Sequence, residues 1–315
     1  MAEAKKRLFT GLQPTGRLHI GNYFGAIRPN VELFETNPGL FCVVDYHALT
    51  SLKNASELRS NIIENTKDYL AAGLNLNNAI LFKQSDVSEH TELAWILNCL
   101  VTVQFLMQGH AYKDKVAKGI EPTAGLLTYP MLMAADILLY DTDVVPVGED
   151  QRQHVEYARE AAAKFNLAFG QTFNEPQEMI KKDVAVVPGT DGQKMSKSYR
   201  NTIPLFGSKD EISKAVMSIV TDSAGAMPAN VYAIHKLFKS ESELKQLYDS
   251  NQGNYKALKE ALTEDIEAFI APMRERRATI GDEEVKKVLK DGGKKARKIA
   301  SAKMSDVREK LGISL

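Results

Sequence analysis

The first half of the chain alternates short apolar runs with helical patterns, and this order restricts the fold more than any other feature. Three runs look like strands and a fourth is a further candidate: LFT (8–10), LFCVV (40–44), AILF (79–82) and VVPV (144–147). Between the second and third runs lies a helical pattern that Asn54 can cap, with Glu57 three residues later, and that Gly73 can end. Strand, helix and strand in this order predict right-handed crossovers and a parallel sheet. We therefore expect an α/β fold whose ligands bind at the carboxyl ends of the strands.

The second half of the chain has a different character. Strand signals end near residue 205, and helical patterns then follow one another. Two helix starts carry capping-box pairs, Ser208 with Glu211 and Ser240 with Glu243. The Gly/Ser/Lys-rich stretch PGTDGQKMSKSYRN lies between the halves and predicts a boundary there. Positive charge collects in the helical third, in MRERR (273–277) and between residues 286 and 310, although a single run of this kind is most often a solvated helix face.

Composition excludes several classes of protein. Apolar residues make up 44% of the 315 residues, which is enough for a packed core and argues against disorder. The 40 basic and 40 acidic residues balance, so a polyanionic partner would have to be held by a local patch. Cys42 and Cys99 lie in apolar runs and are expected as buried thiols in a reducing compartment, and no zinc-ligand cluster is predicted. Neither a signal peptide nor a membrane helix is predicted, so we expect a cytoplasmic protein.

Two segments have the composition of phosphate-binding loops. TGLQPTGRLHIGN (10–22) follows the first strand, and its glycines would let the backbone approach a ligand at the start of a helix. His19 and Asn22 add side-chain donors at that helix start. GQKMSKS (192–198) places Lys194 and Lys197 in a flexible loop, where ammonium groups suit a departing pyrophosphate. Each segment alone is a weak signal, and the second could be a solvated basic loop.

One acidic residue stands in an apolar environment. Asp136 follows methionines and alanines and precedes Ile137, Leu138 and Leu139. Burying a carboxylate costs several kcal/mol, roughly, unless hydrogen-bond donors reach it. The carboxylate is therefore either hydrogen-bonded by groups of the protein itself or available to a ligand that donates a hydrogen bond.

Taken together, these segments resemble the two signatures of class I aminoacyl-tRNA synthetases. LHIGN matches the first signature, usually written HIGH, and KMSKS matches the second letter for letter. Further blocks resemble bacterial tryptophanyl-tRNA synthetases: YFGAIR, VVDYHALT, AGLLTYPMLMAADILLYDTDVVPVGEDQRQH and KMSKS. The blocks extend over the first two thirds of the chain, whereas the helical third resembles the family more loosely. Asn22 stands where the last letter of HIGH is usually histidine, as is common in this branch of the family.

The resemblance implies a domain division and a two-step activity. It implies a Rossmann-like parallel-sheet catalytic domain (1–187), a KMSKS loop and linker (188–204) and an all-helical anticodon-binding domain (205–315). ATP, with Mg²⁺ carried on its phosphates, would convert L-tryptophan to an adenylate, and tRNA(Trp) would then accept the amino acid. The family also suggests a homodimer. Lys294, Lys295 and Arg297 are candidates for phosphate contacts to the tRNA.

The resemblance also implies roles for single residues. In the family, the aspartate at the position of Asp136 accepts the indole N–H of tryptophan. The rest of the tryptophan site would be Tyr129 and Gln151 for the ammonium and carboxylate, with Met133, His47 and Phe9 beside the ring. Lys194, Lys197, His19 and Asn22 would carry catalysis, and no protein-bound metal is implied. The ATP site would consist of Gln13, Pro14, Thr15, Gly21, Asn22, Gly148, Glu149, Asp150, Val186 (or Val187), Lys194, Met195, Ser196, Lys197 and Ser198.

Three alternatives stay open at this point. A tyrosyl-tRNA synthetase shares both signatures, but its pocket motif should differ from MLMAADILLY. A small-molecule nucleotidyltransferase can share the first signature, but it lacks KMSKS and a basic helical tail. A catalytically silent binding protein is disfavoured by the intact KMSKS lysines and by GED at 148–150. Pro29, in the helix after HIGN, should kink or break that helix.

Overall fold

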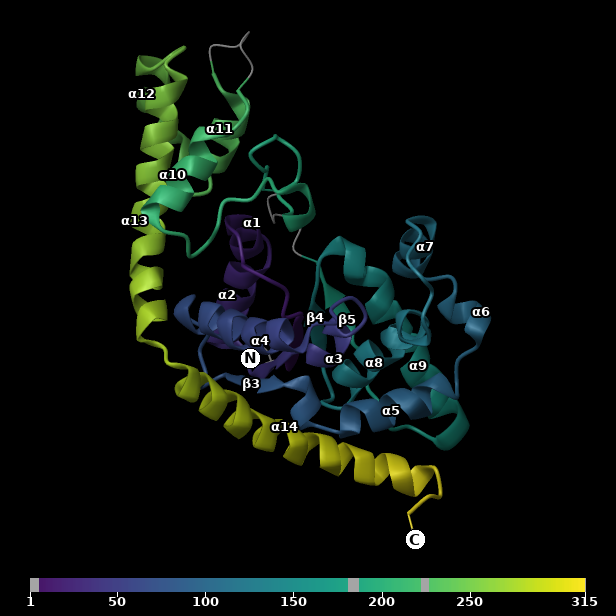
Figure 1. Ribbon diagram of the computed structural model, residues 1–315. Helices are drawn as coiled ribbons and strands as arrows, with labels where there is room; N and C mark the ends of the chain where they lie inside the picture. Colours follow the sequence, from purple (N-terminus) through teal and green to yellow (C-terminus); the bar gives the residue numbers. More distant parts are fainter. Residues whose placement is uncertain (1–5, 181–186, 222–226, 315) are drawn as a thin grey trace.

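The computed structural model describes residues 6–180, 187–221 and 227–314, and its centre is a parallel sheet (Figure 1). The spatial order of the strands is β3-β2-β1-β4-β5, and every neighbouring pair is parallel. The five strands are β1 (Leu8–Leu12), β2 (Gly39–Val43), β3 (Ala79–Lys83), β4 (Val144–Pro146) and β5 (Gln177–Met179). All four expected strands are confirmed. The fifth strand was not predicted, because it is short and carries two polar residues, exposed or half-buried, in place of an apolar run.

Helices cover the sheet in the first half of the chain and dominate the second half. The helices of the first part are α1 (Ile20–Asn22), α2 (Arg28–Thr36), α3 (Asp45–Ala48), α4 (Ala55–Ala71), α5 (Glu89–Asn98), α6 (Val103–Leu106), α7 (His110–Ala117), α8 (Ala124–Leu138) and α9 (Arg152–Phe169). Those of the second part are α10 (Lys209–Met217), α11 (Ala229–His235), α12 (Glu241–Ser250), α13 (Tyr255–Thr279) and α14 (Asp282–Lys310). The predicted change to helices after residue 205 is confirmed for the residues that the structure describes.

The helix starts follow the predicted chemistry, with one exception. Asn54 accepts backbone hydrogen bonds at the start of α4, and Ser208 and Ser240 form the expected capping boxes. Pro29, however, does not break its helix. A π-helical turn, Tyr23–Ile27, leads directly into α2, and Pro29 stands in the first turn of α2, where a missing N–H is best tolerated.

The sheet separates two apolar cores because neighbouring strand residues point to opposite faces. Leu8 packs in one core and Phe9 in the other. The helical third contributes to both: Leu262 of α13 joins the first core and Met304 of α14 joins the second. Figure 1 shows α14 running back beneath the sheet, past β3 and α5. A Cβ atom at Gly292 of α14 would lie 1.8 Å from the Leu81 carbonyl oxygen, so this crossing requires glycine.

The two cysteines differ in environment. Cys42 is buried in β2 as expected, but Cys99 is exposed, so the prediction for Cys99 was wrong. It caps the end of α5, on a side of the molecule where Trp95 is also exposed. Within the described residues, no helix combines the length and the apolar character needed to cross a bilayer.

Candidate active site

A 1040 Å³ cavity lies at the carboxyl ends of β1 and β4, where a doubly wound sheet is expected to bind its ligand. Three segments that are far apart in sequence meet around it: the loop after β1, the turn after β4 and the KMSKS loop. Its lining includes Thr15, His19, Gly21, Asn22, Gly148, Glu149, Asp150, Val187, Lys194, Met195, Ser196 and Lys197. The structure therefore brings together most of the side chains expected around ATP.

Three residues of the expected ATP set do not line the cavity, and a fourth lies outside the described residues. The three are Gln13, Pro14 and Ser198; Pro14 and Ser198 are next in sequence to Thr15 and Lys197, which do line it. Val186 lies outside the described residues, but its neighbour Val187, the alternative at this position, lines the cavity.

His19 is fixed by the start of the helix that it caps. Its Nδ1 accepts the Asn22 N–H at 3.2 Å, and the Asn22 Oδ1 accepts the His19 N–H at 3.1 Å. Burial, followed by the nearby Lys197 charge, lowers the pKa of His19 to about 4. Because Nδ1 acts as an acceptor, the neutral ring carries its proton on Nε2, which becomes a donor. A Cβ atom at Gly21 would lie 2.9 Å from the His19 ring, so this arrangement needs glycine.

The KMSKS loop is attached to the first signature through Lys197. The Lys197 Nζ donates to the backbone oxygens of Thr15 at 2.5 Å and Gly16 at 3.1 Å, and burial lowers its pKa. Asn201 braces the loop from behind, because its Oδ1 accepts the Ser196 N–H and its Nδ2 donates to Asp191. Asn201 was not predicted as a site residue, since nothing in its local sequence distinguishes it from a loop asparagine.

Asp136 is buried in α8, at 1% exposure, and its carboxylate is already surrounded by donors. Oδ1 lies 2.7 Å from the Gln84 Nε2 and 2.6 Å from the His90 Nδ1, and Oδ2 lies 2.8 Å from the His47 Nε2. Burial alone would raise the pKa of Asp136, but the charges and hydrogen bonds of His90 and His47 outweigh it and hold the pKa well below its usual range. Of the two readings that the sequence left open, internal satisfaction is therefore correct for three of the acceptor positions.

The same hydrogen bonds leave one acceptor position of the carboxylate unused. A carboxylate offers about four acceptor positions, two on each oxygen. Oδ1 of Asp136 uses two of them, on Gln84 and His90, whereas Oδ2 uses one, on His47. The remaining position is on Oδ2, beside the half-buried His47 ring.

His90 passes the network on to Tyr140. The His90 Nε2 lies 2.7 Å from the Tyr140 hydroxyl, and burial raises the pKa of Tyr140 far above its usual value, so the phenol stays neutral. Phe9 stacks on Tyr140 with ring centroids 5.9 Å apart and is itself 3% exposed, so it is a core residue behind the network. Gln84 and His90 were missed by sequence reasoning. Gln84 follows β3 directly and could have been suspected on that ground, whereas His90 carries no signal.

A second polar chain connects the remaining predicted residues. The Tyr129 hydroxyl lies 2.7 Å from the His154 Nε2, and the His154 Nδ1 lies 2.8 Å from the Gln151 Oε1. Burial, followed by the charge of His47, lowers the pKa of His154 to about 4, so this ring is neutral near pH 7. The His47 and Tyr129 rings meet edge to face with centroids 6.2 Å apart, so the Asp136 network and the Tyr129–His154–Gln151 network are in contact.

The tryptophan set is thus partly assembled. Asp136, His47, Tyr129 and Gln151 belong to connected chains, and Phe9 lies behind them. Met133 is half-buried on α8 and packs against the same core. Among the described residues, no group of three or more His, Cys, Asp and Glu side chains could hold a metal ion.

Comparison with known proteins identifies relatives over nearly the whole chain. A family model described as tRNA synthetases class I (W and Y) matches residues 1–291. The tryptophan–tRNA ligase of Fusobacterium nucleatum is 46% identical, over 98% of each chain. The crystal structure of Campylobacter jejuni tryptophanyl-tRNA synthetase, complexed with ADP and tryptophan, is 43% identical with a TM-score of 0.92, covering 97% of this chain and 99% of that one. The synthetase of Mycoplasma pneumoniae is 30% identical with a TM-score of 0.85, over 98% of each chain.

Proposed function

Because the chain belongs to the class I tRNA synthetases of the tryptophan and tyrosine type, we propose that it works as a tryptophan–tRNA ligase with the residues described above. It activates L-tryptophan with ATP to tryptophanyl-adenylate and transfers the amino acid to tRNA(Trp). Identity of 43–46% with tryptophan–tRNA ligases over nearly the whole chain favours this activity over a tyrosyl enzyme or a silent binding protein.

Asp136 is the observation that carries the choice of amino acid. We propose that the indole N–H, the only side-chain polar group of tryptophan, donates to the open position on Oδ2. Gln84 and His90 hold the opposite oxygen, so the carboxylate stays ionised and cannot turn. A phenylalanine ring would leave that position unpaired. A site built for a hydrogen bond discriminates strongly against an analogue that lacks it.

The other side chains would bind the substrate backbone and the nucleotide. Tyr129 and Gln151 would hold the ammonium and carboxylate, with Met133 and His47 beside the ring. The loop after β1, the GED turn and the KMSKS residues would hold ATP in the 1040 Å³ cavity. Mg²⁺ would enter with the ATP phosphates, as part of the substrate.

The chemistry needs alignment more than covalent help. The tryptophan carboxylate attacks the α-phosphorus, a carboxylate–phosphate bond forms and the bond to pyrophosphate breaks. Lys194, Lys197 and the Nε2–H of His19 would stabilise the charge that grows on the leaving group. A ribose hydroxyl at the 3′ end of the tRNA then attacks the carbonyl carbon of the adenylate, and AMP leaves.

ATP–pyrophosphate exchange tests the proposal most directly. With all twenty amino acids offered separately, tryptophan alone should support rapid exchange, and transfer to tRNA should follow. Comparable exchange with tyrosine would reverse the assignment, and no exchange with any amino acid would favour a silent binding protein.

We propose that residues 1–187 and the 188–204 loop perform this chemistry while residues 205–315 bind the anticodon arm. We also propose that the protein works in the cytoplasm, where tRNA is charged for translation.

Lys294, Lys295 and Arg297 are exposed on α14 and are candidates for phosphate contacts to the tRNA. Reversing all three to glutamate should lower tRNA charging and reduce its salt dependence while exchange persists. Arg297 also pairs with Glu89, at 3.5 Å, so Arg297→Glu alone serves as the control for that lost contact.

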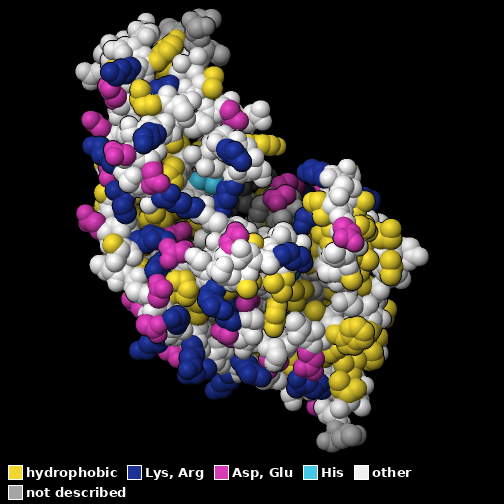
Figure 2. Space-filling model, viewed as in Figure 1, with side chains coloured by type: hydrophobic (Ala, Val, Ile, Leu, Met, Phe, Trp, Pro, Cys, Tyr) yellow, Lys and Arg dark blue, Asp and Glu magenta, His cyan; other side chains and the backbone are white. Residues whose placement is uncertain are grey.

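A homodimer is supported by one apolar surface. Trp95 is 71% exposed, and Val103 and Met107 nearby are 57% and 47% exposed. Figure 2 shows hydrophobic side chains gathered on the side of the molecule that carries α5 to α7. Exposed apolar patches on otherwise polar surfaces mark association sites. We propose that a second copy of the chain covers this one.

A further inference from the structure

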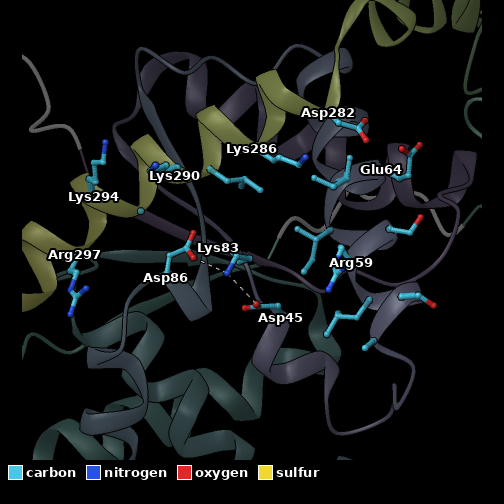
Figure 3. A pocket seen from close by; sticks show the side chains of 18 residues that line it. Asp45, Arg59, Glu64, Lys83, Asp86, Asp282, Lys286, Lys290, Lys294 and Arg297 are labelled. Carbon is cyan, nitrogen blue, oxygen red and sulfur yellow. Dashed lines mark ion pairs between the residues drawn. The ribbon is translucent and has the colours of Figure 1, made fainter.

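A second large cavity lies between α4 and α14, and none of the described residues that line it is assigned to tryptophan or ATP. This α4–α14 groove has a volume of 1080 Å³ and is bounded by Arg59 and Ile62 on α4, by Leu289 and Lys290 on α14, and by Lys83 at the end of β3 (Figure 3). One wall is aliphatic: Leu58, Ile62, Ile63 and Leu289 are half-buried or buried around the groove. A cavity of this size is slightly larger than the usual range of about 300 to 1,000 Å³ for small-molecule sites.

The acids of the groove already have partners of their own. Asp86 pairs with Lys83 at 2.7 Å, and Asp45 accepts both the N–H and the hydroxyl of Ser85. The two acids at the other end are also paired, Asp282 with Lys67 at 2.7 Å and Glu64 with Arg277 at 2.6 Å. None of these carboxylates needs a ligand cation.

The basic side chains of the groove are less fully paired. Among the described residues, Arg59 and Lys290 have no ion pair or side-chain hydrogen bond. Lys294 and Arg297 are exposed, with ion pairs of 3.3 Å to Asp291 and 3.5 Å to Glu89. Arg297 also donates to the Ser88 hydroxyl, and Lys286 pairs with Glu283 at 2.6 Å. After the internal pairs are formed, the groove therefore has an excess of positive charge above an aliphatic wall.

These two properties define the class of ligand. The cations select an anion, and the apolar wall selects a body without polar groups. Among the described residues that line the groove there is no aromatic ring, so they offer a nucleobase no ring on which to stack. We propose that the α4–α14 groove binds an amphipathic anion with an aliphatic chain, the carboxylate or phosphate head facing the rim cations and the chain lying on Leu58, Ile62 and Leu289.

A ligand bound in this groove should affect tryptophan binding through the end of β3. Lys83, at the inner end, contacts Asp86 and lies 3.8 Å from Asp45, so an anionic head competes with both carboxylates for it. The next residue, Gln84, accepts the Tyr46 N–H and donates to Asp136. A shift at the end of β3 therefore changes a hydrogen bond to the carboxylate that selects the amino acid. This coupling rests on the proposed function, whereas the binding itself does not.

Calorimetric titration of the full-length chain, with L-tryptophan saturating so that the amino-acid pocket is filled, tests the binding. The probes are hexanoate, octanoate and decanoate, with decyl phosphate, decanol and inorganic phosphate beside them. Affinity should rise about fourfold for each buried methylene group. Decanol and inorganic phosphate should bind much more weakly than decanoate, and the tighter of decanoate and decyl phosphate identifies the natural head group.

Variants that leave the groove wall intact separate this site from adventitious binding. Arg59→Met with Lys290→Met should weaken decanoate several-fold. Lys287→Met with Lys298→Met, exposed lysines of α14 that do not line the groove, should leave it unchanged. No dependence on chain length, equal binding of decanol, or equal loss in both double variants would overturn the proposal. A groove that takes no alkyl anion, but whose Arg59–Lys290 double variant changes the oligomeric state, would instead be a contact between copies.

The coupling has its own readout. In pyrophosphate exchange, saturating decanoate should change the tryptophan KM at least twofold in the parent chain and in the Lys287–Lys298 variant. The Arg59–Lys290 variant should need a several-fold higher decanoate concentration for the same change. An unchanged tryptophan KM in a chain that binds decanoate would refute the coupling. Loss of exchange with every amino acid, in the absence of any alkyl anion, would refute the proposed function and leave the binding result standing.

Discussion

Replacing Asp136 by asparagine converts one acceptor oxygen of the carboxylate into a donor, and the structure indicates which one. Gln84 and His90 both point N–H groups at Oδ1, at 2.7 and 2.6 Å, so the amide oxygen should remain on that side. The NH2 group then replaces Oδ2. His47 can adapt because its Nε2 becomes an acceptor in the other tautomer. The indole N–H cannot adapt, and two donors would face each other.

The expected loss follows from this mismatch. A buried donor without an acceptor costs roughly 1 to 3 kcal/mol, which corresponds to about 5- to 150-fold in kcat/KM for tryptophan. The assay is ATP–pyrophosphate exchange with tryptophan and with phenylalanine, which has no N–H to lose. The ratio of the two kcat/KM values should fall by the same factor.

Two controls make the result interpretable. Asp141→Asn is the matched change, because Asp141 follows α8 closely but pairs with Lys303 at 2.6 Å, outside the network. Thermal unfolding of both variants shows whether the fold survives. A fall of less than twofold for tryptophan in a folded Asp136→Asn protein, or an equal fall for phenylalanine, would show that Asp136 does not bind the indole.

Three further outcomes are expected. Lys197→Ala should lower the rate of adenylate formation by about 10²- to 10³-fold with little change in tryptophan affinity; equal losses of rate and affinity, measured by single-turnover kinetics and equilibrium binding, would mark the loop as structural. Trp95→Glu should yield monomers in sedimentation velocity, and Trp95, the only tryptophan of the chain, should shift its emission to the red when the parent dimer is diluted; a monomeric parent contradicts the proposed interface. The pKa values of His19 and His154 are lowered to about 4 in the folded chain, so both bind protons more readily when unfolded. Their contribution to the free energy of unfolding should therefore be complete above pH 6.5 and decrease as the pH falls toward 4. Urea unfolding should show a flatter pH profile for His154→Gln, and an unchanged profile would exclude this histidine as a cause.

The sequence predicted those parts of the fold that depend on local patterns. The strands at residues 8, 40, 79 and 144 are apolar runs bounded by turn residues, and the caps at Asn54, Ser208 and Ser240 are local hydrogen bonds. Strand β5 was missed because pairing with β4 stabilises it, rather than any apolar run of its own. Pro29 was misjudged because a π-helical turn before it changes which N–H groups the helix needs.

The candidate site divides in the same way. Its two signatures are short contiguous motifs of the kind that bind phosphate, so they could be recognised in the sequence. The partners of Asp136 come from three segments, at residues 47, 84 and 90, that only the packing of α3, β3 and α5 against α8 brings together. Cys99 was expected to be buried for a related reason. An apolar run does not show which of its faces the core covers.

The placement of Lys197 suits the role proposed for it, which is to stabilise the transition state more than the ground state. Its three contacts are with neutral oxygens, the backbone oxygens of Thr15 and Gly16 and, at 3.5 Å, the Thr15 hydroxyl. Burial lowers its pKa, so the ammonium group is held where a positive charge is incompletely solvated. An anion that develops next to it gains more than it would from a lysine in water. The same contacts join the KMSKS loop to the loop after β1, so they hold the ammonium group at the edge of the cavity in which we propose that ATP binds.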